Sequence, residues 1–238
     1  MLENINDENI LFIDIETVSM LPSFSLLPEK LKYLWNKKAE KLKVADETAD
    51  ELFSKAGIYA EFGKIICISC GFLKTSDKAT YFRIKSFYGD SEKEILNGFN
   101  NLLDSSFNKS DNLLCAHNGK EFDYPYISRR TLINGLKLPK ILNIAGKKPW
   151  EISHLDTMEL WKFGDYKSYT SLDLLSTIFN IPTPKDDIDG SMVGEVYWKD
   201  KDIERIVTYC QKDVLTVAQL YLRYKGKPLI EKKNVIIV

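Results

Sequence analysis

The sequence predicts an α/β protein in which a mixed central sheet is flanked by helices. Three observations support this fold class: an early apolar run of strand length, two more strand-like runs joined by a polar turn, and a series of helix-like segments in the second half. With 238 residues and 44% hydrophobic content, the chain can bury a large core. We expect one domain spanning residues 1–238.

Four segments are expected to form strands. Residues 9–15 are almost continuously apolar, as is typical of a central strand covered on both faces. Residues 64–73 and 79–87 predict two further strands, and the polar residues between them predict the turn. Residues 113–117 fit a short buried strand.

Helices follow the third and fourth strands. Ser91 with Glu94 three residues later predicts a capping box, and the Asn118-Gly119 turn leads into a second helix. Further helices are expected near residues 157–163, 171–180 and 201–224. Three strands, a helix, a strand, a helix and then more helices is the element order of the ribonuclease H-like fold.

About 47 residues separate the first two strands, where a tight turn would suffice. Apolar residues at helical spacing predict a helical insertion at about residues 20–60. Its lysines fall mostly off the apolar stripe, so they form either a solvated helix face or a flap that contacts phosphates. These lysines are Lys30, Lys32, Lys37, Lys38, Lys41 and Lys43.

Composition and motifs exclude several classes of protein. The net charge of −1 means that any nucleic-acid contact must come from local basic patches. The N-terminus lacks a signal-peptide pattern and no apolar run approaches the ~18 residues of a membrane span, so we expect a cytoplasmic protein without membrane contact. Walker, dinucleotide-binding and nucleophile-elbow motifs are absent from the sequence.

Cys67 and Cys70 have the spacing of a zinc or redox pair, but both lie in an expected strand. Residues three apart in a strand point to opposite faces, so the two thiols cannot share a metal. We expect core thiols in a reducing compartment.

An acidic pair at the first strand is the leading candidate for a metal site. A D-x-E triplet is expected about once by chance in a chain of this length, and this chain has three. Two of them, at residues 90–92 and 202–204, fall where helices begin and complement the helix dipole. Only Asp14-Ile-Glu16 ends a buried strand with both side chains on one face, where open α/β sheets bind ligands.

Other candidates come from two expected helices. Asp123 opens the helix after residue 117, while Tyr209 and Asp213 lie four residues apart and therefore share a helix face. Taken singly, each could be an ordinary edge or surface residue. Together with Asp14 and Glu16 they form a carboxylate set suited to magnesium or manganese, and the nearby Tyr points to phosphodiester cleavage.

These motifs resemble those of a known superfamily. The strings Asp14-Ile-Glu16-Thr17, Asn118-Gly-Lys-Glu-Phe122-Asp123-Tyr-Pro125-Tyr and Tyr209-Cys-Gln-Lys-Asp213 are similar to the three exonuclease motifs of the DEDD superfamily, in the form found in the proofreading domain of family B DNA polymerases. The resemblance covers most of residues 9–224 outside the insertion. Residues 166–191 also resemble stand-alone, polymerase-B-like exonucleases of bacteria. Only about 14 residues follow the last expected helix, so we expect no polymerase domain.

The resemblance implies a role for each motif residue. Asp14, Glu16 and Asp213 would hold one divalent ion, and Asp14 would bridge to a second ion supported by Asp123. Subfamilies differ in whether a Tyr or a His positions the attacking water, and here Tyr209 matches, which implies the DEDDy subgroup.

Three further residues match positions near the terminal nucleotide, namely Thr17, Asn118 and Phe122. For Phe122 a packing role is equally open. His117 is expected to be structural, and no motif fixes a role for Asp156.

The function implied is that of a 3′-5′ exonuclease with two Mg²⁺ or Mn²⁺ ions, acting on single-stranded or frayed DNA and releasing nucleoside monophosphates. An exoribonuclease is the first alternative, and a non-catalytic nucleic-acid-binding or recruiting module is the second. The expected partner is nucleic acid with a free 3′ end, DNA more than RNA, beside a separate polymerase or a repair complex. The tail at residues 232–238 is either an added strand or a docking peptide.

Overall fold

The computed structural model describes residues 2–44, 46–76, 79–165, 169–182 and 188–238. Within them, one mixed sheet has the strand order β5-β4-β1-β2-β3-β6. The central strands β1, β2 and β3 are antiparallel, whereas β4 joins β1, β5 joins β4 and β6 joins β3 in parallel. The strands are β1 Ile10–Ser19, β2 Gly63–Ser76, β3 Ala79–Tyr88, β4 Leu113–Ala116, β5 Leu155–Asp156 and β6 Val235–Ile237.

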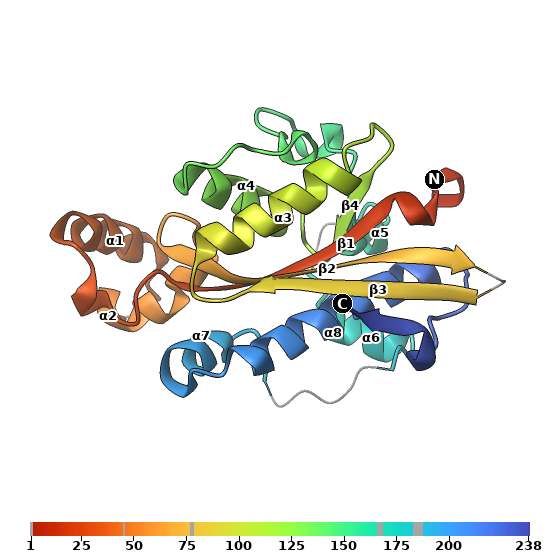
Figure 1. The fold of residues 1–238 in the computed structure, drawn as a ribbon. Coiled ribbons are helices and arrows are strands. Elements are labelled where there is room, and N and C mark those ends of the chain that lie inside the picture. The colour runs from red at the N-terminus through yellow and green to blue at the C-terminus, as the bar shows by residue number, and fades with distance from the viewer. Residues whose placement is uncertain (1, 45, 77–78, 166–168, 183–187) are drawn as a thin grey trace.

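Helices cover both faces of this sheet. Figure 1 shows α3 and α4 above it and α6, α7 and α8 below it, with α1 and α2 beyond one end. The helices are α1 Glu29–Leu42, α2 Ala49–Leu52, α3 Glu92–Ser106, α4 Asp123–Ile133, α5 Thr157–Lys162, α6 Leu172–Ile178, α7 Val193–Glu195 and α8 Ile203–Tyr224. The sequence did not predict α7 or the π-helical turn Val196–Asp200 that follows it.

The core has a layer on each face of β1. Leu11 and Ile13 belong to the apolar cluster under α3 and α4, whereas Ile10 and Phe12 pack with residues of α8. This two-sided burial is what the continuous apolar run predicts. Alternation along the strand then directs Asp14 toward α8.

The first strand is longer than expected. It continues to Ser19, because β2 pairs with it as far as Gly63, with a register shift between Glu16 and Thr17. Asp14 and Glu16 therefore lie inside the strand, and the prediction that they end it is wrong. Parallel pairing with β4 nevertheless stops at Phe12, so no strand among the described residues pairs with this edge of β1 beside the carboxylates.

The predicted capping box at α3 is also wrong. Ser91 occupies the N-cap position, but its side chain makes no capping hydrogen bond. The adjacent Glu92 turns inward, where it accepts a hydrogen bond from the Ile65 amide at 2.7 Å and pairs with the buried Arg130. At the other end of the chain, the tail adds β6 beside β3, which agrees with the added-strand interpretation.

Residues 20–62 form a projecting unit that we call the α1–α2 lobe (Figure 1). Its core surrounds Trp35, which is fully buried and donates its indole N–H to the Ala49 carbonyl at 2.7 Å. Two side chains of α4 attach the lobe to the sheet: the Tyr126 hydroxyl donates to the Gly57 carbonyl at 2.6 Å, and Arg130 donates to the Ala60 carbonyl at 2.8 Å.

Candidate active site

The first acidic pair faces α8. Asp14 Oδ2 lies 3.2 Å from the Cys210 thiol, which donates to it. Donor atoms of Asp14, Glu16 and Cys210 all lie within 4.8 Å of one another, and Glu16 is only 8% exposed. The sequence analysis missed Cys210, although it sits between Tyr209 and Asp213 in the third motif.

Asp123 reaches the same place from the opposite side of the sheet edge. It is the first residue of α4, is 3% exposed, and accepts a hydrogen bond from the backbone N–H of Ile15. That amide is available because β4 stops pairing with β1 at Phe12. The Ile15 amide, which has no partner in β4, thus holds Asp123 beside β1.

The third motif lies on α8, where Tyr209 and Asp213 are about one helical turn apart. The Tyr209 hydroxyl hydrogen-bonds to Asp213, as the four-residue spacing allows. The charge of Asp213 acts in turn on both Asp14 and Glu16. The structure therefore brings together all four carboxylates and the Tyr that the sequence analysis singled out.

Burial and mutual repulsion dominate the electrostatics of this cluster. Burial first, and then the charges of neighbouring carboxylates, raise the pKa of Asp14 and of Glu16 well above the ordinary range. Burial raises the pKa of Asp123 to about 8, although hydrogen bonds to its carboxylate oppose the shift. Burial and the charge of Asp213 raise the pKa of Tyr209, so its hydroxyl stays protonated at neutral pH. Burial and neighbouring charges thus disfavour the ionised forms of Asp14, Glu16 and Asp123, and a bound cation would favour them.

This donor set fits a hard divalent cation. Four carboxylates, of which Glu16 and Asp123 are buried and Asp14 and Asp213 half-buried, offer oxygen ligands of the kind that Mg²⁺ and Mn²⁺ prefer. Burial raises the pKa of the Cys210 thiol well above its ordinary value, so this group stays neutral and serves as a hydrogen-bond donor to Asp14.

The Asp156 side chain orients the loop that leads to Asp123. Asp156 accepts hydrogen bonds from the amides of Asn118 at 3.0 Å and Lys120 at 3.1 Å, and it also caps α5. Asn118 adopts a left-handed conformation with φ of 63°. Its side-chain Oδ1 is buried and has no hydrogen-bond partner within the described residues. Asp156, whose role the sequence left open, is thus a positioning residue for this loop.

Both histidines have structural partners. His117 contacts the Thr157 hydroxyl at 2.9 Å and the Thr170 carbonyl at 2.8 Å, while His154 contacts the Ile141 carbonyl at 2.9 Å. Burial lowers the pKa of each imidazole below the ordinary value. These contacts agree with the structural role expected for His117.

Thr17 and Phe122 both lie against Tyr126. The Thr17 hydroxyl hydrogen-bonds to the Tyr126 hydroxyl, and the Phe122 ring lies 5.3 Å from the Tyr126 ring. Phe122 is half-buried and packs on the core, so its packing role is real. Contact of either residue with a nucleotide stays a prediction.

The four cysteines are buried free thiols, as expected. Cys67 packs with Cys210 on the α8 face, whereas Cys70 belongs to the cluster beneath α3 and α4. The two thiols therefore lie on opposite faces of β2, and the sequence-based rejection of a shared metal is confirmed.

A mixed α/β sheet with clustered acidic side chains fits a metal-binding protein, and comparisons with known proteins identify the family. Residues 58–228 match the model of a family described as predicted 3′-5′ exonucleases related to the exonuclease domain of PolB, and the chain belongs to this family. Asp14 and Glu16 lie before the matched range. The chain is also similar to a DNA polymerase of Pyrococcus glycovorans, with 23% identity over 197 residues, which are 76% of this chain and 24% of the polymerase.

These findings confirm the exonuclease family that the motifs indicated, while the DEDDy subgroup and a stand-alone bacterial origin stay predictions. The chain spans about a quarter of the polymerase that it matches. Among the described helices, none is long and apolar enough to cross a bilayer.

Proposed function

We propose that this protein is a two-metal 3′-5′ exonuclease that hydrolyses phosphodiester bonds at the 3′ end of single-stranded or frayed DNA and releases nucleoside monophosphates. One observation carries the proposal: carboxylates from β1, α4 and α8, far apart in the chain, meet at one point beside a Tyr. A cluster of buried like charges is costly for folding, and cation binding is the function that explains its presence.

Each carboxylate has an assigned part. Asp14, Glu16 and Asp213 would hold one Mg²⁺ or Mn²⁺ ion, and Asp14 with Asp123 would hold the second. Bound ions of this kind supply activation of the attacking water and stabilise charge on the departing 3′ oxygen. The hydrogen bonds from Cys210 to Asp14 and from Ile15 to Asp123 keep these two carboxylates oriented.

Tyr209 is assigned to positioning. Its hydroxyl remains protonated because burial and neighbouring carboxylates raise its pKa, so it cannot serve as a general base. It can orient the attacking water by hydrogen bonding while Asp213 holds the hydroxyl in place. Asn118, Thr17 and Phe122, which match motif positions near the terminal nucleotide, would contact that nucleotide.

DNA is favoured over RNA because the family is related to a DNA polymerase's exonuclease domain, and the similar archaeal protein is itself a DNA polymerase. A separate polymerase or repair complex is the protein partner that suits such an activity.

The decisive experiment is a time course on 5′-labelled single-stranded DNA and RNA of one sequence, with Mn²⁺, Mg²⁺ or chelator. Wild type should give a metal-dependent ladder that shortens from the 3′ end, and Asp14→Ala should give none. Asp173→Ala, at an exposed acidic residue of α6, is the matched control and should cleave normally. Faster shortening of RNA would favour the exoribonuclease, and binding without cleavage under either metal would favour a recruiting module.

A further inference from the structure

Helix α1 has two opposite faces of different character. Its buried stripe packs into the core of the α1–α2 lobe and includes Trp35 and Ala39. The opposite face presents exposed side chains at spacings of three, four and four residues, which align along about three turns of helix. These residues are Lys30, Tyr33, Lys37 and Lys41, and we call them the α1 strip.

The aromatic member of the strip lies between two cations. Tyr33 is 51% exposed, and the ammonium groups of Lys30 and Lys37 lie 5.6 Å and 4.6 Å from its ring centroid. Leu34, which is 40% exposed, adjoins it. The strip thus combines a half-exposed aromatic ring with positive charge.

The three lysines of the strip have no acidic partner among the described residues, because the acidic residues of α1 pair with other lysines. Glu29 pairs with Lys32 at 2.9 Å, and Glu40 pairs with Lys43 at 2.8 Å, so the two acidic residues of the helix engage lysines outside the strip. Within the described residues, no carboxylate lies within ion-pair distance of the three lysines of the strip. This face of α1 therefore carries unpaired positive charge in a chain whose net charge is −1.

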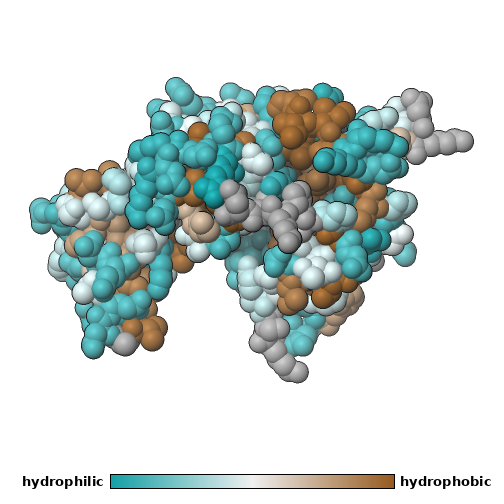
Figure 2. All heavy atoms as spheres, turned by 90° about the horizontal axis from the view of Figure 1, so that it is seen from below, coloured by the Kyte–Doolittle hydropathy of each residue, from teal (hydrophilic) through white to brown (hydrophobic). Residues whose placement is uncertain are grey.

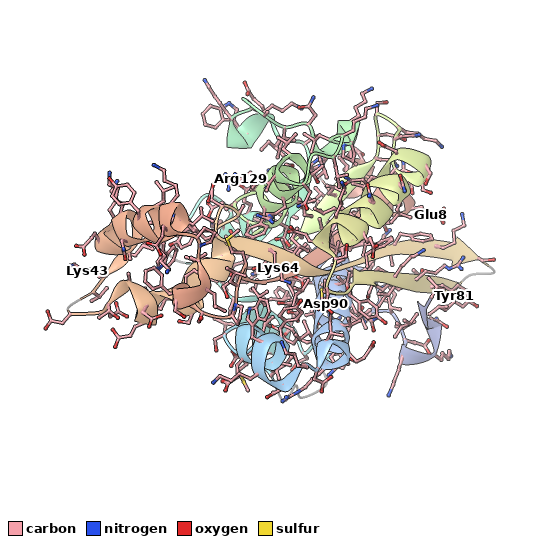
Figure 3. All side chains as sticks on the ribbon, turned by 60° about the vertical axis from the view of Figure 1, so that its left-hand side comes forward. Glu8, Lys43, Lys64, Tyr81, Asp90 and Arg129 are labelled. Atoms are coloured by element: carbon pink, nitrogen blue, oxygen red, sulfur yellow. The ribbon has the colours of Figure 1, made fainter. Side chains whose placement is uncertain are left out.

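The lobe is connected to the two elements that carry Glu16 and Asp123. Its first residue follows directly after Ser19, three residues or about 10 Å along β1 from Glu16. Tyr126 and Arg130 of α4, the helix that begins with Asp123, bind the lobe's last turns. Figure 2 shows an open notch between lobe and body, and Figure 3, where Lys43 marks the lobe, shows its outer side chains projecting into solvent.

We propose that the α1 strip binds single-stranded nucleic acid on the 5′ side of the end that enters the carboxylate site. Lysines spaced along a helix meet successive phosphates, and the Tyr33 ring stacks on a base of any sequence. The exposed aromatic favours nucleic acid over an acidic protein as the occupant, because a base offers it a π-face. This inference rests on the proposed exonuclease function and names the part of the substrate that the lobe holds.

The test compares substrate lengths and salt concentrations. Wild type, Lys30→Ala/Lys37→Ala/Lys41→Ala and Tyr33→Ala are measured for binding by fluorescence anisotropy and for cleavage, on DNA of about 20 and about 4 nucleotides. Lys32→Ala/Lys43→Ala is the control, since it removes two lysines that lie off the strip, one within α1 and one at its C-cap. Thermal melting checks that all variants are folded.

The triple variant should bind the long strand at least about tenfold more weakly. The slope of log affinity against log salt should fall by about 2 in magnitude, since each phosphate contact to a single strand contributes about 0.7. Tyr33→Ala should lower affinity about fivefold or more with the slope unchanged. Turnover of the 4-nucleotide substrate should be the same in every variant.

An unchanged affinity and salt slope in the triple variant would overturn the inference, and the strip would then be a solvated face or a site for a protein. An equal loss in the control double variant would also overturn it, because the effect would then reflect overall charge. If wild type cleaves neither length with either metal, the exonuclease proposal fails, while the binding measurements still decide the role of the strip.

Discussion

The carboxylate centre and the α1–α2 lobe place their charges in opposite ways. The centre assembles acidic side chains from residue 14 to residue 213 and buries them against one another. The lobe is built from the contiguous residues 20–62, with an aromatic core inside and lysines outside. The centre therefore gives up stability for a binding site, whereas the lobe gains stability from its core and presents its charge to solvent. Substitutions in the centre should therefore reduce cleavage without reducing stability, whereas substitutions in the core of the lobe should reduce stability without reducing cleavage of short substrates.

Asp14→Asn should have the largest effect. Cleavage should fall at least about a thousandfold, because this carboxylate is assigned to both metal ions. The metal-free protein should melt at a higher temperature, because the substitution removes a carboxyl group whose ionisation is disfavoured by burial and by the charges of Asp213 and Asp123. Cleavage assays and calorimetry in chelator measure the two effects. A variant that lost both activity and melting temperature would show that Asp14 serves the fold, and the contrast between the regions would fail.

Trp35→Ala should destabilise the lobe by about 3–5 kcal/mol, as expected when a large buried aromatic is truncated. Trp35 packs edge-on against Phe53 and Phe62 and donates to Ala49. Limited proteolysis should then cut within residues 20–62, while cleavage of a 4-nucleotide substrate persists. Asn36→Ala, at the exposed neighbouring position, should leave the proteolysis pattern unchanged. Loss of short-substrate cleavage in Trp35→Ala would mean that the lobe and the centre fold as one unit.

Tyr209→Phe should reduce turnover about 10- to 100-fold and leave metal affinity unchanged, since the hydroxyl positions water and is no metal ligand. Metal titrations by calorimetry, beside single-turnover cleavage, provide the two readouts. Tyr197→Phe removes a hydroxyl that contacts Asp90 and Lys64, and it should be neutral for turnover. Equal losses of turnover and metal affinity for Tyr209→Phe would refute the assigned role.

Local patterns in the sequence predicted what depends on local physics. The two-sided burial of Ile10 to Ile13 followed from a continuous apolar run, and the shared face of Tyr209 and Asp213 followed from helical spacing. Asp14 and Glu16 could be chosen from the three D-x-E triplets because the other two begin helices, where acidic residues complement the helix dipole. A triplet on a buried strand has no such explanation.

Long-range pairing decided what the sequence could not show. β1 extends to Ser19 because β2 continues beside it, and Ile15 is free to bind Asp123 only because β4 is short. Likewise, Glu92 replaced the expected capping box because Arg130, distant in sequence, offered a buried partner. Each of these features depends on residues that no local window contains.

The pH dependence of stability is the smallest expected effect: the melting temperature of the metal-free protein should change by a few degrees, and the carboxylate centre should account for the change. Burial raises the pKa of Asp123 from 3.8 to about 8, so between these values the folded state binds more protons than the unfolded state. The contribution of Asp123 to the stability of the metal-free protein therefore falls as pH rises through this window. His117 and His154 act in the opposite sense, because burial lowers the pKa of each below 6.5, so their contribution is complete above that pH.

Melting temperatures between pH 6.5 and 8 in chelator isolate the carboxylates from the histidines. Wild type should lose stability across this range, and Asp123→Asn should lose less, because the raised pKa values of Asp14 and Glu16 still act in the same direction. Saturating Mg²⁺ should remove the decline in wild type, because a bound cation favours the deprotonated carboxylates and its binding becomes stronger as pH rises. A melting temperature that rises with pH in chelator would show that these carboxylates are already ionised in the folded protein. The buried charge of the centre would then be compensated by the protein itself, and the centre would no longer differ from the lobe in needing a cation.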